Sequence, residues 1–223
     1  SFTRAQQDAF AIESVTRAQQ AAASGAFAAE IVPVKIAAKD GEKIVDSDEG
    51  PRKINVEKIP ALKPAFKKAG TITAASSSSI NDGAAALILM RQSTAKMLGA
   101  SALARVVGYT SHAQAPAWFT TAPIYAIQKL FEKTGWRAND VDLYEINEAF
   151  AVVPMAVMAD LGIDRARMNI HGGACALGHP IGASGARIVV TLLHALQLHK
   201  KQRGVASLCI GGGEATAMAI ELC

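Results

Sequence analysis

The stretch from Asn169 to Arg187 constrains this chain more than any other part of its sequence. It holds five glycines, two histidines and one cysteine, and it runs directly into an apolar helical pattern. Glycine lets the backbone approach a ligand closely, and a helix N-terminus offers unpaired N–H groups and a positive dipole end. We therefore predict a ligand-facing loop, then a helix that begins at Pro180 and covers about 181–199. His179, at their junction, is suited to move protons or stabilise an oxyanion.

The composition narrows the class of ligand. The chain has 223 residues, half of them hydrophobic, which is enough for a substantial core in one or two domains. Its net charge is +4 and its basic residues are scattered, so we expect no nucleic-acid partner. A mild basic bias suits an anionic small molecule such as a nucleotide or coenzyme.

Cysteine usage and hydropathy suggest a compartment. Three cysteines, Cys175, Cys209 and Cys223, form no disulfide framework, which is typical of a reducing compartment. The apolar runs are too short to span a bilayer and no signal peptide is recognisable, so we expect no membrane partner. We expect the cytoplasm, with an organellar matrix as the alternative.

The order of the expected elements indicates the fold class. We predict helices at 3–24, 93–98, 122–134, 148–161 and 181–199, and strands at 31–36, 43–45, 84–90, 103–109, 141–146, 168–170, 205–210 and 215–222. Asp40-Gly41 predicts a hairpin turn and Gly211–Gly213 another turn. The run 84–90 reads as a fully buried parallel strand. The repeating strand–helix order predicts an α/β fold in layers, with a mostly parallel sheet.

The serine run Ser76–Ser79 has two interpretations. It is typical of a flexible linker, which is the more common case. The alternative is a small-residue loop that lies against a ligand.

Three polar residues follow or end strands of the predicted sheet. Asn147 follows the strand 141–146, His179 follows the strand 168–170 and its loop, and Cys209 lies near the end of the strand 205–210. Ligands of such sheets bind outside the carboxyl ends of the strands. We therefore predict that these three residues share one edge and form a catalytic constellation, with a thiol base or nucleophile beside an imidazole.

Each of the three also has a purely structural interpretation. Asn147 could cap the next helix, His179 could bond only to backbone, and Cys209 could be an inert buried thiol. The glycine loop is neither a P-loop, since no Gly-Lys-Ser/Thr follows, nor a dinucleotide fingerprint. His171, Cys175 and His179 are too few and too close together for a zinc site, so we predict no metal.

Three motifs closely resemble the C-terminal signatures of the thiolase family. They are Asn147-Glu-Ala-Phe-Ala151, the stretch Gly172–Arg187 and Leu208-Cys-Ile-Gly-Gly-Gly213; the segments Asn81–Ala86 and Arg4–Ala11 match as well. The resemblance covers essentially the whole chain. It implies a thiolase-like layered α/β/α fold with a complete C-terminal half and an incomplete N-terminal half.

The resemblance implies a coenzyme A-dependent acyltransferase. Such an enzyme interconverts two acetyl-CoA with acetoacetyl-CoA plus CoA, or cleaves longer 3-ketoacyl-CoA, through an acyl-cysteine. His179 would activate the nucleophilic cysteine and then donate to a thioester oxygen, and Asn147 would hold the water of that oxyanion hole. Cys209 would be the acid/base at the α-carbon, and the N–H of Gly211 would serve a second oxyanion hole. A base of this kind needs a pKa near ambient pH, which a thiol beside an imidazole can supply.

Further assignments concern the substrate. By resemblance, Ser78 would line the pantetheine tunnel, Arg52 would meet the adenosine end of CoA, and Ala149 and Phe150 would line the acyl pocket. CoA thioesters are then substrates, and no permanently bound cofactor is implied. Many relatives have Gly-x-Gly-Pro where this chain has Thr120-Thr-Ala-Pro123, and we expect a preference for short acyl chains. The family also implies a homo-oligomer, a dimer or a tetramer.

The chain departs from the family in one respect. Thiolases carry their nucleophilic cysteine in a Cys-Ser-Ser/Gly motif of the N-terminal half, and none of the three cysteines fits that motif. The domain organisation expected is a partial lid at 1–79, a returning strand and helix of the first half at 80–103, and the second half at 104–223. We therefore predict that the isolated chain is inactive and exposes a large apolar face.

Two alternatives remain. One is a non-catalytic thiolase-like subunit that binds CoA, although it would not need both His179 and Cys209. The other is a decarboxylating condensing enzyme of the same superfold, which would pair His179 with a histidine or asparagine rather than with Cys209.

Overall fold

Four strands form the sheet on which the site is built, in a computed structural model that describes residues 1–39 and 41–223. Across the sheet the order is β3 (Ala104–Ala113), β6 (Glu214–Leu222), β5 (Arg203–Cys209) and β4 (Leu143–Ile146). β4 runs parallel to β5, whereas β5–β6 and β3–β6 are antiparallel.

The prediction of a mostly parallel sheet is therefore wrong. Only four residues, 210–213, connect β5 to β6, and the resulting hairpin must be antiparallel. A parallel connection needs a crossover of a dozen or more residues, which this turn cannot supply.

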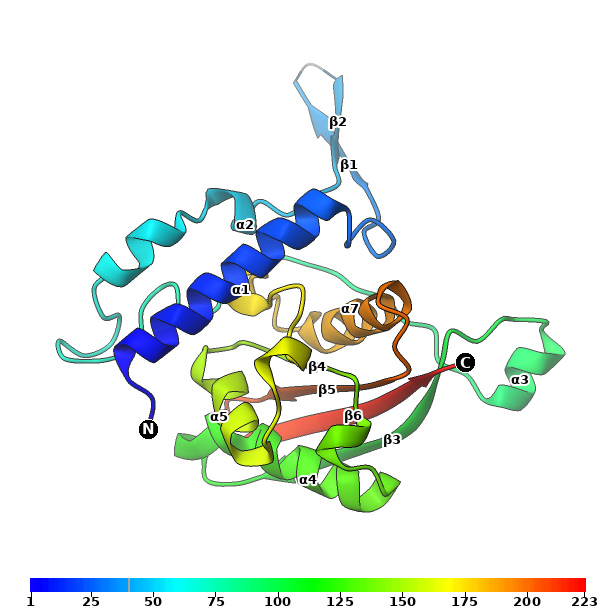
Figure 1. Ribbon diagram of the computed structural model, residues 1–223. Coiled ribbons are helices and arrows are strands. Elements are labelled where there is room, and N and C mark those ends of the chain that lie inside the picture. The colour runs from blue at the N-terminus through cyan, green and yellow to red at the C-terminus, as the bar shows by residue number, and fades with distance from the viewer. Residues whose placement is uncertain (40) are drawn as a thin grey trace.

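Helices cover both faces of the sheet, so the layered α/β/α architecture is confirmed (Figure 1). α4 (Ala122–Thr134) and α5 (Val152–Leu161) pack on one face, and α7 (Ser184–Leu198) packs on the other. Successive side chains of a strand point to opposite faces of the sheet and so fill the hydrophobic core on each face. Tyr144 of β4 faces α4 and α5, whereas Leu143 faces α7. The 21-residue helix α1 (Arg4–Ser24) lies outside α7 and packs against the short α6 (Ala174–Leu177).

The remaining elements are short. They are the antiparallel hairpin of β1 (Val34–Ala38) and β2 (Gly41–Val45), the helices α2 (Gly50–Lys53) and α3 (Gln92–Met97), and the 3-10 segments Val56–Ala61, Pro116–Thr121, Ala138–Asp140 and Arg165–Arg167. Of the predicted turn Asp40-Gly41, Asp40 lies outside the described residues. No helix of the described residues is long and apolar enough to cross a membrane.

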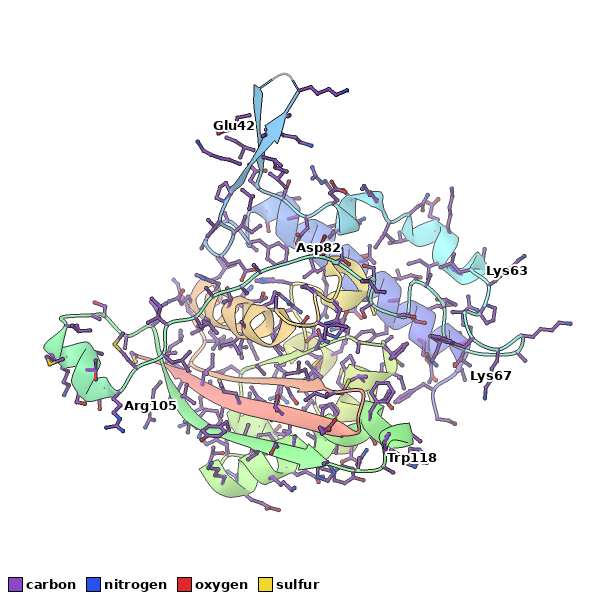
Figure 2. All side chains as sticks on the ribbon, turned by 180° about the vertical axis from the view of Figure 1, so that it is seen from behind. Glu42, Lys63, Lys67, Asp82, Arg105 and Trp118 are labelled. Carbon is purple, nitrogen blue, oxygen red and sulfur yellow. The ribbon has the colours of Figure 1, made fainter. Side chains whose placement is uncertain are left out.

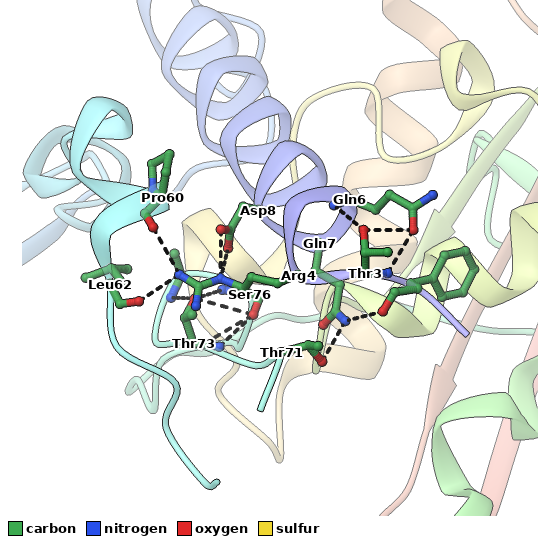
Figure 3. A network of polar contacts seen from close by, with 12 residues as sticks. Thr3, Arg4, Gln6, Gln7, Asp8, Pro60, Leu62, Thr71, Thr73 and Ser76 are labelled. Carbon is green, nitrogen blue, oxygen red and sulfur yellow. Dashed lines mark hydrogen bonds and ion pairs between the residues drawn. The ribbon is translucent and has the colours of Figure 1, made fainter. Parts of the chain in front are cut away.

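The first turn of α1 anchors the polar segment that follows the hairpin (Figure 3). Thr3 caps the helix in a capping box with Gln6, as its position predicts. Arg4 forms an ion pair with Asp8 and donates to the carbonyl oxygen of Leu62 at 2.7 Å. These contacts hold the segment around residue 62 against α1.

The apolar run 84–90 is not a buried strand. It is extended but belongs to no strand, and Ile88 is 88% exposed. Figure 2 shows the segment that carries Asp82 crossing the back of the molecule toward α3. Similarly, the predicted strand 168–170 is reduced to a single bridge between Tyr144 and Met168. Apolar composition indicates that a segment needs a partner, but it does not say which segment provides one.

Candidate active site

Asn147 and His179 meet at the carboxyl edge of β4. Asn147 directly follows β4, its N–H donates to the carbonyl oxygen of Ser207 on β5 at 3.0 Å, and its side chain is 1% exposed. Its Nδ2 lies 3.3 Å from Nε2 of His179. α5 begins five residues later and its N-cap residue is Ala151, so the helix-cap interpretation of Asn147 is wrong.

His179 is held by side chains rather than by backbone alone. Its N–H donates to the carbonyl oxygen of Ser79 at 3.0 Å, and its Nδ1 lies 2.5 Å from Oγ of Ser184. α7 begins at Ser184, not at Pro180, because residues 181–183 form a turn. Burial, reinforced by the positive charge of Arg187, lowers the pKa of His179 and keeps the imidazole neutral.

Ser184 was not recognised from sequence, and it determines the tautomer of His179. Its hydroxyl is 3.0 Å from the carbonyl oxygen of Pro180. When it donates there, it accepts from Nδ1–H and leaves Nε2 as an acceptor. When it turns to donate to Nδ1, Nε2 carries the proton. A serine four residues after Pro180 gives no signal of this role in the sequence.

Cys209 ends β5, the strand beside β4, so the parallel pairing brings it to the edge where Asn147 lies. The thiol is buried, 6% exposed, and burial raises its pKa to about 11. This shift is opposite to the one expected for a thiol beside an imidazole. In this structure Cys209 is a neutral thiol, suited to give a proton rather than to take one.

Gly211 lies in the turn that follows. It is exposed, and its N–H donates to no acceptor among residues 1–39 and 41–223. The neighbouring Gly213 closes the turn with φ +103°, and a Cβ there would collide with the carbonyl oxygen of Gln114. Within the described part of the chain, the turn therefore leaves the amides of Gly211 and Gly212 free.

The serine run is an ordered part of the site, so the linker interpretation is wrong. The N–H and Oγ of Ser78 both donate to the carbonyl oxygen of Ala149, at 3.1 and 3.2 Å. Ser77 bridges to Phe150 in antiparallel fashion. This pairing keeps residues 147–150 out of the helix and explains why α5 begins at Val152 rather than at Glu148. Phe150 also packs edge-on against Phe119, with ring centroids 6.1 Å apart.

Arg52 lies outside this constellation. It is exposed on α2, and its Nε donates to the carbonyl oxygen of Asp48 at 3.3 Å. A cavity of about 300 Å³ lies beside α2, with Asp46, Asp48 and Leu177 in its wall. Asp46 and Asp48 give this wall an acidic character, and none of the three catalytic candidates lines it.

A buried carboxylate that sequence analysis missed supports the site. Glu148 is fully buried and accepts hydrogen bonds from Oγ of Ser14 (2.6 Å), Nδ2 of Asn169 (2.8 Å) and the N–H of Cys175 (3.1 Å). Each of these donors lies on a different segment: α1, the loop after Met168, and α6. A Cβ on Gly173 would collide with this carboxylate, which explains the glycine there. Cys175 is thus a structural residue, and burial raises its pKa.

A second buried carboxyl group lies between β4 and α7. Glu145 of β4 is 3.6 Å from Arg187 of α7. Burial raises the pKa of Glu145 to about 8 in spite of the arginine, because loss of hydration outweighs the attraction. Arg187 also faces Glu30, whose pKa burial raises to about 7.

Two thiolase family models match the chain. The model of the thiolase N-terminal domain matches residues 1–93, and that of the thiolase C-terminal domain matches residues 100–222.

Curated relatives and solved structures agree with this match. The chain is 51% identical to a probable acetyl-CoA acetyltransferase of Dictyostelium discoideum, over 98% of the chain and 53% of the relative. It is 50% identical to the acetyl-CoA acetyltransferase of Escherichia coli, over 98% of the chain and 56% of the relative.

Among solved structures, the acetyl-CoA acetyltransferase of Bacillus anthracis superposes with a TM-score of 0.96 at 45% identity, covering 100% of the chain and 57% of that protein. The Acat5 thiolase of Ascaris suum, solved in complex with coenzyme A, gives 0.89 at 42% identity, covering 100% of the chain and 56% of that protein. The chain therefore spans about half the length of the relatives it matches. Because the family models, the curated relatives and the superposed structures all agree, the chain belongs to the thiolase family.

Proposed function

We propose that the protein to which this chain belongs is an acetyl-CoA C-acetyltransferase. It would interconvert two acetyl-CoA with acetoacetyl-CoA and CoA. The observation that carries the proposal is the contact of Asn147 with His179 at the sheet edge where β5 ends in Cys209. Relatives about half identical to the chain are named acetyl-CoA acetyltransferases, and they support this substrate class.

His179 needs two protonation patterns for this chemistry. To activate a nucleophilic thiol, Nε2 must accept a proton; to stabilise a thioester oxyanion, Nε2 must donate one. The hydroxyl of Ser184 can favour either form by pointing to Pro180 or to Nδ1. Among residues 1–39 and 41–223, Oδ1 of Asn147 has no hydrogen-bond partner although it is buried, which suits the proposed water of the oxyanion hole.

Cys209 would handle the proton at the α-carbon. In cleavage, its neutral thiol would protonate the enolate of the departing acetyl-CoA. In condensation, its thiolate would remove the α-proton, so the pKa of about 11 must fall when substrate binds. The free amide of Gly211 would stabilise the carbonyl oxygen of the acyl-enzyme.

The substrate contacts are proposed on the same basis. Ser78, tied to the chain just after Asn147, would line the pantetheine tunnel, and Ala149 and Phe150 would line the acyl pocket. The exposed guanidinium of Arg52 would meet the adenosine end of CoA from α2. A homo-oligomer is the assembly expected.

A comparison of two cysteine variants of the full-length protein tests the proposal. Cys223 is exposed and lies at the opposite end of the sheet from Cys209, because β6 runs antiparallel to β5. We expect Cys209→Ala to lower kcat for CoA-dependent cleavage of acetoacetyl-CoA by about 10²–10⁴-fold, and Cys223→Ala to leave it unchanged. The Cys209→Ala protein should still exchange an acetyl group with CoA. Unchanged cleavage by Cys209→Ala would refute the assignment.

The isolated chain gives a second test. We expect the 223-residue chain alone to cleave no acetoacetyl-CoA, whereas the full-length protein does. If the full-length protein binds CoA but cleaves no acetoacetyl-CoA, the alternative of a CoA-binding subunit is correct.

A further inference from the structure

A stripe of polar side chains runs along the mostly apolar helix α7. Ser184, Arg187 and Thr191 lie at positions i, i+3 and i+7, which share one face of a helix. Ser184 and Thr191 are buried, and the side chain of Arg187 is 19% exposed. Because buried polar groups cost stability unless they are satisfied, each of the three should have a hydrogen-bond partner or another role.

The two ends of the stripe have partners. Oγ of Ser184 lies 2.5 Å from Nδ1 of His179. Oγ of Thr191 donates to Oε1 of Glu30 at 3.3 Å. The stripe therefore contacts the catalytic candidate at one end and the segment between α1 and β1 at the other.

Arg187 lies between these ends, and hydrogen bonds do not account for it. Its Nη1 is 3.6 Å from Oε2 of Glu145 on β4, which is too far for a hydrogen bond. Within the described part of the chain, its Nε and Nη1 are buried and have no hydrogen-bond partner. An arginine kept only to join two elements would use these donors. What the residue contributes here is its positive charge.

Buried carboxyl groups surround Arg187 but do not cancel its charge below neutral pH. Burial raises the pKa of Glu145 to about 8 and that of Glu30 to about 7, although Arg187 opposes both shifts. Below pH 7 both carboxyl groups are therefore mainly protonated. Four further charged groups act on the carboxyl groups around Arg187: Arg165, Glu148, Asp48 and Arg52.

The charge of Arg187 acts on His179. Ser184, which contacts the imidazole, lies one turn from Arg187 on the same face of α7. Burial lowers the pKa of His179, and the positive charge of Arg187 lowers it further. The amide of Asn147 and the carbonyl oxygen of Ser79, which also contact His179, are uncharged. Arg187 thus supplies a charge that disfavours the imidazolium.

We propose that Arg187 is a positioning residue whose uncancelled charge keeps His179 as a neutral imidazole, the form that accepts a proton from the nucleophilic thiol. The inference rests on the proposed function, in which this proton transfer begins the reaction. Arg187 acts through His179, and the protonated carboxyl groups around it leave its charge available.

The pH dependence of kcat/KM for acetoacetyl-CoA cleavage by the full-length protein tests the proposal. The loss of activity on the acid side reports the pKa of His179 in the free enzyme. We expect Arg187→Gln to move this acid limb to higher pH by about 0.5 unit or more, because repulsion of the imidazolium is lost. Arg187→Lys keeps the charge and should leave the limb near its original position. Arg105→Gln is the control and should not move it, since the ion pair of Arg105 with Glu221 lies at the sheet edge farthest from β4.

Two results would overturn the proposal. One is an acid limb that stays in place in Arg187→Gln while kcat falls equally at every pH, as expected of a purely structural residue. The other is a limb that moves as far in Arg187→Lys as in Arg187→Gln. If Arg187→Gln does not fold, the double variant Arg187→Gln/Glu145→Gln replaces it, because it leaves no buried carboxylate without its partner. The same shift of the limb is expected in the double variant.

Titration of the His179 imidazole by NMR separates this inference from the proposed function. The measurement uses substrate-free, full-length protein with ¹³C-labelled histidine, and His179→Asn identifies the signal. In Arg187→Gln the imidazole should titrate at higher pH than in the parent protein, whether or not the protein cleaves acetoacetyl-CoA. Equal titration in the two proteins refutes the inference, whereas a parent protein that cleaves no acetoacetyl-CoA refutes only the proposed function.

Discussion

Glu148 follows Asn147 in the chain, and its carboxylate holds three other segments in place around the site. Two oxygens accept three hydrogen bonds, and the residue is fully buried. Buried polar networks of this kind are costly when one partner is lost, because a donor remains without an acceptor. The position of Asn147 therefore depends on the residue beside it.

Replacing that carboxylate by an amide tests this dependence. In Glu148→Gln, an NH₂ group must face at least one of the donors Ser14, Asn169 or the N–H of Cys175. We expect the free energy of unfolding to fall by about 2–4 kcal/mol, measured by urea denaturation. Glu132→Gln, on the exposed side of α4, is the control and should change stability by less than about 0.5 kcal/mol. Equal stability of the two variants would contradict the network.

The raised pKa of Glu145 predicts a dependence of stability on pH. Its pKa is about 8 in the folded protein and 4.5 in the unfolded chain, so folding favours the protonated carboxyl. Its contribution to stability is complete below pH 4.5 and is lost as the pH rises toward 8. Glu145→Gln should remove the part of the pH-dependent loss of stability that comes from Glu145. The melting temperature of the variant should therefore fall less than that of the parent protein between pH 5 and pH 8, the range between the two pKa values. A parallel decline in both proteins would show that Glu145 is ionised throughout.

At the scale of single residues, sequence reasoning found the groups that follow strand ends and missed the groups that support them. Asn147 and Cys209 could be predicted because the carboxyl ends of neighbouring strands meet. Glu148 and Ser184 could not, since a polar residue within a motif carries no sign of whether it is buried. The direction of the Cys209 pKa shift was also predicted wrongly, because burial raises the pKa of this thiol.

At the scale of elements, the β5–β6 hairpin offers a matched pair of glycines. Gly213 has φ +103° and a Cβ would collide with the backbone of Gln114, whereas open space surrounds the Cβ position of Gly211. We expect Gly213→Ala to destabilise the protein by at least about 1–3 kcal/mol, and Gly211→Ala to cost less than about 1 kcal/mol. Thermal unfolding measures both. Similar losses in the two variants would mean that the turn tolerates a side chain at either position.

The same hairpin explains where prediction of the elements failed. The bounds of α1 and α4 followed from Thr3, Gly25 and Gly135, residues with a local effect on helix ends. Strand direction depended instead on the length of the connection, and α5 began late because Ser76 and Ser78 pair with the preceding residues. Such pairing joins segments about seventy positions apart, and a local pattern holds no information about it.

At the scale of the whole molecule, an exposed apolar segment predicts association of the isolated chain. Ile80, Ile88 and Met97 are 95%, 88% and 77% exposed. Large apolar side chains this exposed favour association in solution. We expect the 223-residue chain to form concentration-dependent oligomers by light scattering, and Ile88→Glu to reduce them. Ile44→Glu, on the hairpin of β1 and β2, is the control. A strictly monomeric chain would contradict this expectation.

The link between Ser14 and Glu148 has a consequence for how the protein acquires its site during synthesis. The two residues are 134 positions apart, and their side chains meet in the interior at 2.6 Å. Contacts between residues so distant in sequence form late and slow folding. On the ribosome, α1 emerges long before β4 does, so its buried face must wait for the segment that carries Glu148. That face stays without its partner until residue 148 has been synthesised, and a pause in translation between the two would leave it open to chaperones.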